Sequence, residues 1–149
     1  MNIAINKYAK RDYEILNEIE AGIKLSGTEV KSTKAGRVDM KGSFASIEKG
    51  EVWLKNLYIA PYSHAAKQER TYEPRQSRKM LLNKKEIFSL NNDLAGKSIS
   101  LVPMRIYNKK GLIKVILGVG KGRKKYDKRE VIKKRDFERR KLQSMHFKT

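Results

Sequence analysis

Few side chains in this sequence have the types and spacing that enzymatic chemistry requires. The two histidines, His64 and His146, have no carboxylate or cysteine at a spacing that would form a metal or catalytic site. The glycines of 118–122 are arranged like a phosphate loop, but Arg123 stands where a dinucleotide loop needs glycine, and no GxxxxGK(S/T) pattern is present. We therefore expect no enzymatic activity and no cofactor, and we interpret 118–122 as a flexible exit from the last strand.

Basic and aromatic side chains, by contrast, have the types that contact nucleic acid. The chain carries 35 Lys and Arg against 16 Asp and Glu, which gives a formal net charge of +19 at pH 7. Lysine and arginine bind phosphates, and aromatic rings stack on unpaired bases. Tyr126 lies between Lys125 and Asp127, so it is either a stacking ring or simply an exposed aromatic. The charge predicts an anionic partner, and nucleic acid is favoured.

The remaining composition narrows the class of protein. No apolar run approaches the roughly 18 residues that span a bilayer, and no basic-then-apolar signal opens the chain. Cysteine is absent, which excludes a disulfide framework and thiolate metal ligands. We expect a cytoplasmic protein that contacts no membrane and is monomeric when free.

The charge also divides the chain into two parts. Residues 121–149 contain thirteen Lys or Arg and four Asp or Glu, and their apolar residues do not share one helical face. Such a tail is expected to stay disordered until a partner neutralises it. Residues 1–120 are expected to form one compact domain.

Within that domain, apolar residues alternate with polar ones where strands are expected. The strands are predicted at 12–25, in two runs within 43–62, at 98–107 and at 112–118. Lys49-Gly50 and the four residues 108–111 are the predicted hairpin loops. Gly22 suggests a bulge, Pro103 suggests an edge or a bulge, and Trp53 is expected in the core.

Two short helices are predicted between the strand pairs. Thr28 is the expected N-cap of the first, which ends at Gly36, although Lys31 stands where a capping box needs Glu or Gln. Asn83 is the expected N-cap of the second, with Glu86 completing a capping box. Ile87, Leu90 and Leu94 are expected to form the apolar face of this helix. Leu82 and Ile87 are placed as a hydrophobic staple, and Gly96 is expected to end the helix. Residues 1–11 are expected to form no element, and 64–77 to form a mobile loop.

These elements predict a mainly β fold of five or six short strands with two or three short helices and a basic C-terminal tail, and a small antiparallel OB-like barrel, closed or nearly closed, fits them best. Small basic barrels of this kind commonly bind nucleic acid, but a fold alone does not establish function.

Several stretches, in order along nearly the whole chain, carry a more specific signal. They are Asn6-Lys7, Ala9 and RDY at 11–13; EAGIKLSGTEVKS at 20–32 with Ala35-Gly36; GEVWL at 50–54; RKMLLNKKEI at 78–87; KVILGVGKGRKKYDKRE at 114–130; and IKKRDF at 132–137. The set resembles the SsrA-binding protein (small protein B) family, the bacterial partners of transfer-messenger RNA.

The resemblance implies a six-stranded OB-type barrel without enzyme activity. It implies binding to the tRNA-like domain of transfer-messenger RNA (SsrA RNA) and delivery of that RNA to stalled ribosomes. The tail would occupy the empty decoding site and mRNA path, contact ribosomal RNA there and become helical. The alanine-charged RNA would then tag the nascent chain for degradation and release the ribosome.

Individual roles follow only from positions that match the family. The RNA-facing positions are Glu29, Lys31, Leu81, Leu82, Asn83, Lys114, Lys121, Arg123 and Lys124. The ribosome-facing positions are Tyr126, Asp127, Lys128, Arg129, Ile132, Lys133, Lys134, Arg135 and Phe137. The family often has His in place of Tyr126, and Trp also occurs in place of Phe137; each change keeps an aromatic ring.

Local explanations compete at some of these positions. Asn83 is equally consistent with a capping role alone, and Leu81 and Leu82 with core packing. Glu29 in a first helical turn would also favour the helix dipole. Charge and fold by themselves also allow a ribosomal or general RNA-binding protein, and, less well, an RNA-processing enzyme.

Overall fold

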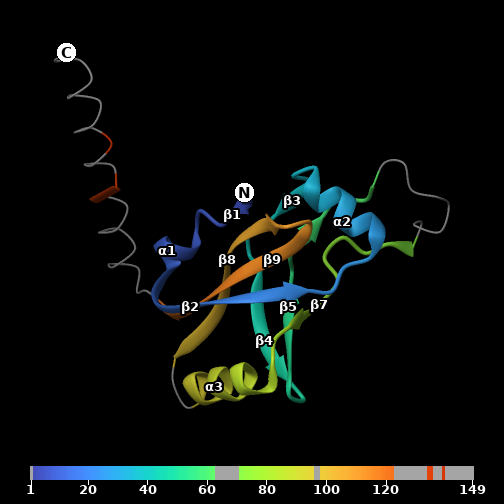
Figure 1. Ribbon diagram of the computed structural model, residues 1–149. Helices are drawn as coiled ribbons and strands as arrows, with labels where there is room; N and C mark the ends of the chain where they lie inside the picture. The colour runs from blue at the N-terminus through green and yellow to red at the C-terminus, as the bar shows by residue number, and fades with distance from the viewer. Residues whose placement is uncertain (1, 63–70, 96–97, 123–133, 136–138, 140–149) are drawn as a thin grey trace.

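Six strands close into an antiparallel ring in the computed structural model, which describes residues 2–62, 71–95, 98–122, 134–135 and 139 (Figure 1). In ring order they are β8 (Ile99–Lys109), β4 (Phe44–Glu48), β5 (Glu51–Lys55), β7 (Arg78–Leu81), β2 (Tyr13–Ile23) and β9 (Leu112–Gly122). The ring closes because β9 also pairs with β8. The predicted six-stranded OB-like barrel is confirmed.

The first residues of the chain form elements that local patterns did not predict. β1 (Asn2–Ile5) pairs with β8 outside the ring, and the short helix α1 (Ala9–Asp12) follows it. The Asn6 side chain donates a hydrogen bond to the Pro103 carbonyl at 2.9 Å, which fixes the turn between β1 and α1. The expectation of no element here is wrong because the partner strand is about 100 positions away in the sequence.

Two tight turns join neighbouring strands of the ring. Lys49 and Gly50 between β4 and β5 both have positive φ, as do Lys110 and Gly111 between β8 and β9. Two successive residues with positive φ are typical of two-residue hairpin turns that match the twist of the strands. The turn at Lys49 is confirmed, whereas the second loop is shorter than predicted because β8 and β9 run up to it.

Alternation along β5 separates the inside of the barrel from its outside. Val52 and Leu54 are fully buried in the core, whereas Trp53 between them is only half-buried. Trp53 therefore points outwards, on the face where it pairs with Ser46 and Lys79. The expectation that Trp53 belongs to the core is wrong because its alternation phase is that of the outer face.

The register between paired strands shifts at two places in the ring, one in β2 and one in β8. The register of β2 shifts between Ile15 and Asn17, and not at Gly22, which stays in register. The register of β8 shifts just after Pro103, so the predicted bulge there is confirmed.

The glycines near the end of β9 pack closely instead of forming a loop. A Cβ on Gly118 would lie 2.8 Å from Met104 Sδ, and one on Gly120 would lie 3.0 Å from Tyr13 Cβ. Both positions lie in the strand, which continues to Gly122. The interpretation of 118–122 as a flexible exit is therefore wrong.

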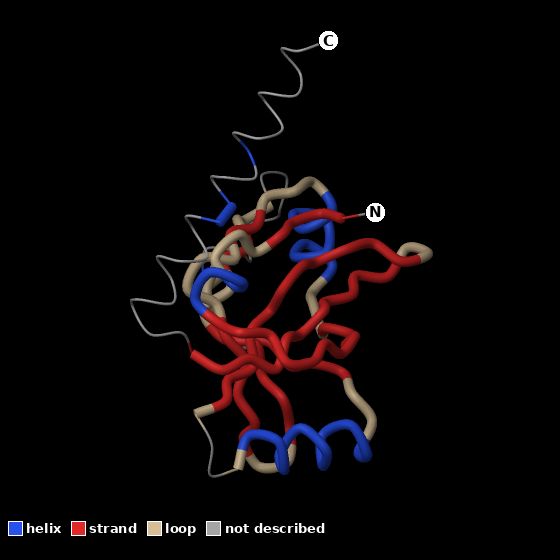
Figure 2. The backbone as a smooth tube through the Cα atoms, turned by 90° about the vertical axis from the view of Figure 1, so that its left-hand side faces the viewer, coloured by secondary structure: helices blue, strands red, loops and turns tan. Residues whose placement is uncertain are grey.

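The two longer helices lie at opposite ends of the barrel (Figures 1 and 2). α3 (Lys84–Leu94) has the predicted capping box of Asn83 and Glu86, and its apolar residues Ile87, Leu90 and Leu94 pack against the core. α2 (Gly27–Lys34) is capped by Ser26 and not by Thr28. A short sheet of β3 (Val38–Asp39) and β6 (Tyr58–Ile59) completes the fold, and β6 contacts α2.

Candidate nucleic-acid interface

A three-strand surface of the barrel brings together residues that are far apart in the sequence. Gly22 on β2 pairs with Leu81 on β7 and with Lys114 on β9. Directly paired residues of antiparallel strands point to the same face. A Cβ added to Gly22 would lie 3.2 Å from Leu81 Cβ, so the missing side chain leaves room for Leu81, which is 51% exposed. Leu81 and Lys114 thus lie on the same face on either side of Gly22, which is itself buried.

A hollow of about 550 Å³ lies over this surface and reaches the start of α3. Four predicted RNA-facing residues line it, namely Leu81, Leu82, Asn83 and Lys114. We call this the β7–β2–β9 hollow. The structure therefore brings these four residues into one site.

The charges around the β7–β2–β9 hollow are mixed, but its carboxylates are engaged with protein groups. Glu51 pairs with Lys79 at 3.1 Å, and Glu86 accepts a hydrogen bond from the Asn83 backbone. Glu20 accepts hydrogen bonds from Tyr107 and from Lys109. The hydrogen bond from Tyr107 is the main reason that the pKa of Glu20 is lowered. Within the described ranges, no ion pair within 4.0 Å involves Lys114 or Lys84. These two ammonium groups remain available to phosphates.

Local roles account for part of what Leu82 and Asn83 do. Leu82 and Ile87 are half-buried against the core, at the positions of the predicted staple. Asn83 Oδ1 accepts from the Glu86 backbone at 2.8 Å. Asn83 is nevertheless exposed, and its Nδ2 donates no hydrogen bond to any described residue. Capping therefore leaves the two N–H donors of the amide free for a ligand.

Glu29 lies elsewhere, at the opposite end of β7 from Leu81, and it is 4% exposed. Its Oε1 accepts from the Ser26 backbone at 3.1 Å, which completes the capping box of α2. Its Oε2 accepts from Arg78 Nε at 2.6 Å, and also from Tyr72 and Gln76. Both carboxylate oxygens of Glu29 are thus engaged inside the protein.

Arg78 uses every donor of its guanidinium group. Nε binds Glu29, Nη1 donates to the carbonyls of Leu57 and Gln76, and Nη2 donates to Tyr72 Oη and to the Pro74 carbonyl. A guanidinium has five N–H donors, so none is left unpaired. Arg78 is 3% exposed and was not predicted as a functional position. Arg78 lies two positions before Met80, which is 1% exposed, so strand alternation indicates that both side chains point into the barrel.

The same network anchors part of the segment that was expected to be a mobile loop. Tyr72 Oη donates to the Ile59 carbonyl at 3.0 Å, and the Pro74 carbonyl accepts from Arg78. Positions 71–77 are therefore tied to the barrel end, contrary to the expectation, and 64–70 lie outside the described residues. The chain enters β7 from this anchored turn, so Glu29 and Arg78 fix where the strand that carries Leu81 begins.

The electrostatics of this buried cluster favour ionised Glu29 and neutral Tyr72. Burial alone would raise the pKa of Glu29, but hydrogen bonds from Ser26 and Arg78, with the charge of Arg78, lower it overall. Burial, followed by the charge of Glu29, raises the pKa of Tyr72 to about 12. The cluster therefore keeps one ion pair and one neutral phenol across the physiological pH range.

The other predicted site residues lie apart from the β7–β2–β9 hollow or outside the described residues. Lys31 is exposed on α2, with Nζ 5.4 Å from the centroid of the Tyr62 ring. Lys121 is exposed near the end of β9 that is remote from Lys114. Lys134 and Arg135 are exposed and have helical backbone. The residues outside the described ranges are Arg123, Lys124, Tyr126, Asp127, Lys128, Arg129, Ile132, Lys133 and Phe137.

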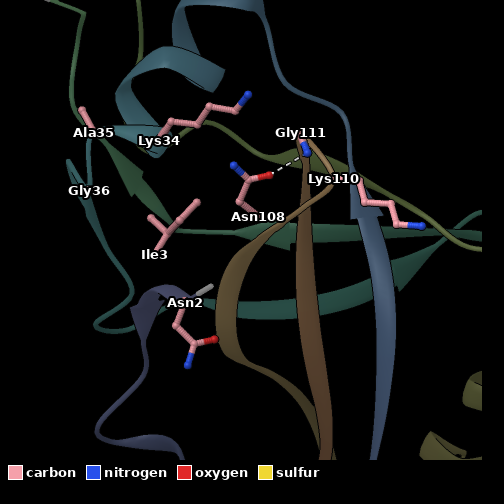
Figure 3. A pocket seen from close by; sticks show the side chains of 8 residues that line it. All are labelled: Asn2, Ile3, Lys34, Ala35, Gly36, Asn108, Lys110 and Gly111. Atoms are coloured by element: carbon pink, nitrogen blue, oxygen red, sulfur yellow. Dashed lines mark hydrogen bonds between the residues drawn. The ribbon is translucent and has the colours of Figure 1, made fainter.

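A second hollow, of about 570 Å³, lies between β1, the end of α2 and the β8–β9 turn (Figure 3). Asn108 Oδ1 accepts a hydrogen bond from the Gly111 backbone at its edge. None of the predicted site residues lines it.

The described ranges hold neither a cluster of metal ligands nor a membrane-spanning helix. No group of three or more His, Cys, Asp or Glu lies close enough to hold a metal ion there. His64 and His146 lie outside those ranges. Among the same residues, no helix has the length and apolar character needed to cross a bilayer.

Comparisons with known proteins agree on one family. The family model described as SmpB protein matches residues 3–147. An SsrA-binding protein of Streptococcus suis (strain 98HAH33) is 48% identical over 137 residues, which are 92% of this chain and 87% of the relative. One from Streptococcus pyogenes serotype M3 is 47% identical over 146 residues, or 97% of this chain and 93% of the relative. A solved structure described as "tmRNA-SmpB: a journey to the center of the bacterial ribosome" superposes with a TM-score of 0.67 and 45% identity, covering 87% of this chain and 93% of that one.

Proposed function

The chain belongs to the SmpB protein family, and from this membership we propose that it is an RNA-binding adaptor of trans-translation. It binds the tRNA-like domain of transfer-messenger RNA and delivers that RNA to stalled ribosomes. The nascent chain is then tagged for degradation and the ribosome is released. The match over residues 3–147 and the relatives named above support this proposal.

The observation that carries the proposal is the convergence of Leu81, Asn83 and Lys114 on one exposed surface. Lys114 neutralises a phosphate, and the free amide of Asn83 donates to a base or ribose oxygen. Leu81, which is 51% exposed, offers an apolar contact to an unpaired base. These are the contacts by which a protein recognises the shape of a folded RNA and its unpaired nucleotides.

Glu29 supports this surface in our proposal without touching the RNA. Its carboxylate is buried and occupied by Arg78, so it holds the entry into β7, the strand that ends at Leu81. Lys31 and Lys121 are exposed and contact phosphates at a greater distance from the β7–β2–β9 hollow, and Arg123 and Lys124 continue the basic exit from β9.

We assign ribosome binding to residues 123–149. This tail begins two positions later than expected from the sequence, because β9 extends to Gly122. In our proposal this tail is helical in the empty decoding site and mRNA path. The residues that contact ribosomal RNA there are Tyr126, Asp127, Lys128, Arg129, Ile132, Lys133, Lys134, Arg135 and Phe137. The protein works in the cytoplasm, is a monomer when free, and performs no catalysis of its own.

Gel-shift titration at two salt concentrations tests the proposal. The probes are a tRNA-like RNA and a plain duplex of equal length, each with the full chain and with residues 1–122. We expect both proteins to prefer the tRNA-like RNA, with affinity that falls steeply with salt. Equal affinity for the two RNAs would favour a general RNA-binding protein instead. Cleavage of either RNA by the pure protein, abolished by a point substitution, would favour a processing enzyme.

A further inference from the structure

Phe88 is the most exposed large apolar side chain recorded in the described part of the chain. It lies on α3 and is 69% exposed, whereas Leu90, about half a turn away, is 3% exposed. α3 packs on the barrel through the side that carries Leu90, so its stability does not require an aromatic ring at position 88. The ring at position 88 is therefore not part of the packing that holds α3 on the barrel.

A hollow of about 430 Å³ lies between this ring and the β4–β5 turn. Phe88, Ile87 and Asn91 line it from α3, and Lys49 and Gly50 line it from the turn. Lys84, one turn before Phe88 on the helix, and Ile47 on β4 complete the lining. An aromatic ring, an amide and two ammonium groups thus surround this space, and no carboxylate lines it.

This hollow, which we call the Phe88 hollow, adjoins the β7–β2–β9 hollow. The two share Gly50, Lys84 and Ile87 in their linings. An RNA strand lying across Leu81 and Lys114 therefore reaches the Phe88 hollow without leaving the protein surface. Lys84, on the boundary between them, is placed to bind the phosphate that links the two sites.

We propose that Phe88 is a stacking platform for one unpaired base of the bound RNA, with Lys84 and Lys49 holding the phosphates on either side. Charge selects this occupant, because a lining of two cations without a carboxylate complements a polyanion. A flat, exposed ring beside cations is the arrangement that unpaired bases use. This inference rests on the proposed function and adds to it a specific nucleotide subsite.

The test compares Phe88→Ala with Phe44→Ala, which removes another exposed phenylalanine, 44% exposed on β4 and outside the Phe88 hollow. The probes are the tRNA-like RNA, a short unpaired oligoadenylate and a fully paired duplex. We expect Phe88→Ala to weaken binding to the first two by about 5- to 150-fold, the range for losing one stacked base. Binding to the duplex, and all binding by Phe44→Ala, should stay unchanged. Phe88→Tyr should retain binding.

Direct stacking has its own optical signal. In a Trp53→Phe background, Phe88→Trp places the only tryptophan of the chain in the Phe88 hollow. We expect oligoadenylate to quench its fluorescence, whereas the plain duplex should not.

Unchanged affinity of Phe88→Ala for oligoadenylate and for the tRNA-like RNA would overturn the inference. So would sedimentation in which the wild type self-associates and Phe88→Ala does not, since the ring would then cover a second copy of the chain. If the wild type shows no preference for the tRNA-like RNA while Phe88→Ala still weakens oligoadenylate binding, the proposed function fails and the stacking site stands. If the wild type prefers the tRNA-like RNA and Phe88→Ala binds that RNA and oligoadenylate with unchanged affinity, the proposed function stands and the stacking site fails.

Discussion

Leu81 and Lys114 pair with the same residue, Gly22, from opposite sides. The two side chains therefore share one face of the barrel, with only the backbone of β2 between them. Their positions are 33 apart in the sequence, and the pairing of β7 and β9 with β2 brings them together. An apolar contact and a cation at this spacing form the centre of the proposed RNA surface.

Replacing Lys114 should weaken RNA binding without affecting folding. Lys114→Gln removes one phosphate contact, so we expect lower affinity for the tRNA-like RNA and a salt dependence, in log–log form, that is shallower by about one. Gel shifts over a range of salt concentrations measure both quantities. Lys7→Gln, at an exposed lysine beside α1, is the matched control for charge. A salt slope that drops equally in both variants would show that only net charge matters.

Removing Arg78 should destabilise the barrel strongly. Arg78→Met leaves the Glu29 carboxylate buried without its cation, and losing one partner of a buried ion pair costs about 3–5 kcal/mol. Chemical denaturation measures the free energy of unfolding. Lys79→Met is the control on the same strand, since its pair with Glu51 is exposed and should contribute at most about 1 kcal/mol. Similar losses for the two variants would contradict the role given to Arg78.

Glu29 should make stability depend on pH in the acid range. The pKa of Glu29 is lowered in the folded state. Its contribution to the free energy of unfolding is therefore complete above the ordinary glutamate pKa, about 4.3, and is lost as pH falls through the pKa of the folded state. Glu29→Gln keeps an acceptor for the Ser26 backbone but has no charge to titrate. The difference in unfolding free energy between wild type and Glu29→Gln should therefore shrink below about pH 4.3. A difference that is constant from neutral to acid pH would contradict the ion pair.

Asn83 should prove to have two separable roles. Asn83→Ala removes the cap of α3 and should cost about 0.5–2 kcal/mol of stability. Asn83→Ser keeps a capping oxygen but lacks the amide donors, so we expect near-normal stability together with weaker binding to the tRNA-like RNA. Denaturation and gel shifts on the two variants separate the effects. Full RNA affinity in Asn83→Ser would reduce Asn83 to a helix cap.

The architecture was predictable where the signals are local. Strand alternation, the Lys49-Gly50 turn and the Asn83–Glu86 capping box all appear in short windows of sequence, and each is confirmed. The cap of α2 was also within reach, because Ser26 and Glu29 have the spacing of a capping box. The prediction of Thr28 as this N-cap is wrong, although its hydroxyl has the same capping chemistry.

Other features depended on distant parts of the chain. β1 exists because β8 provides its partner, and Arg78 is satisfied by carbonyls of Leu57 and Pro74 that no local pattern connects to it. The position of Glu29 in the sequence matched an RNA-facing residue, whereas only the folded barrel shows its carboxylate enclosed by Arg78. The β7–β2–β9 hollow likewise required the closed sheet.

A purified translation reaction measures whether this protein couples transfer-messenger RNA to stalled ribosomes. Ribosomes stalled on a message without a stop codon receive alanine-charged transfer-messenger RNA with no protein, with the full chain, or with residues 1–122. We predict tagged nascent chains with the full chain alone, although residues 1–122 still shift the tRNA-like RNA in gels. Tagging that is equal with and without the protein would show that the protein does not couple this RNA to the ribosome.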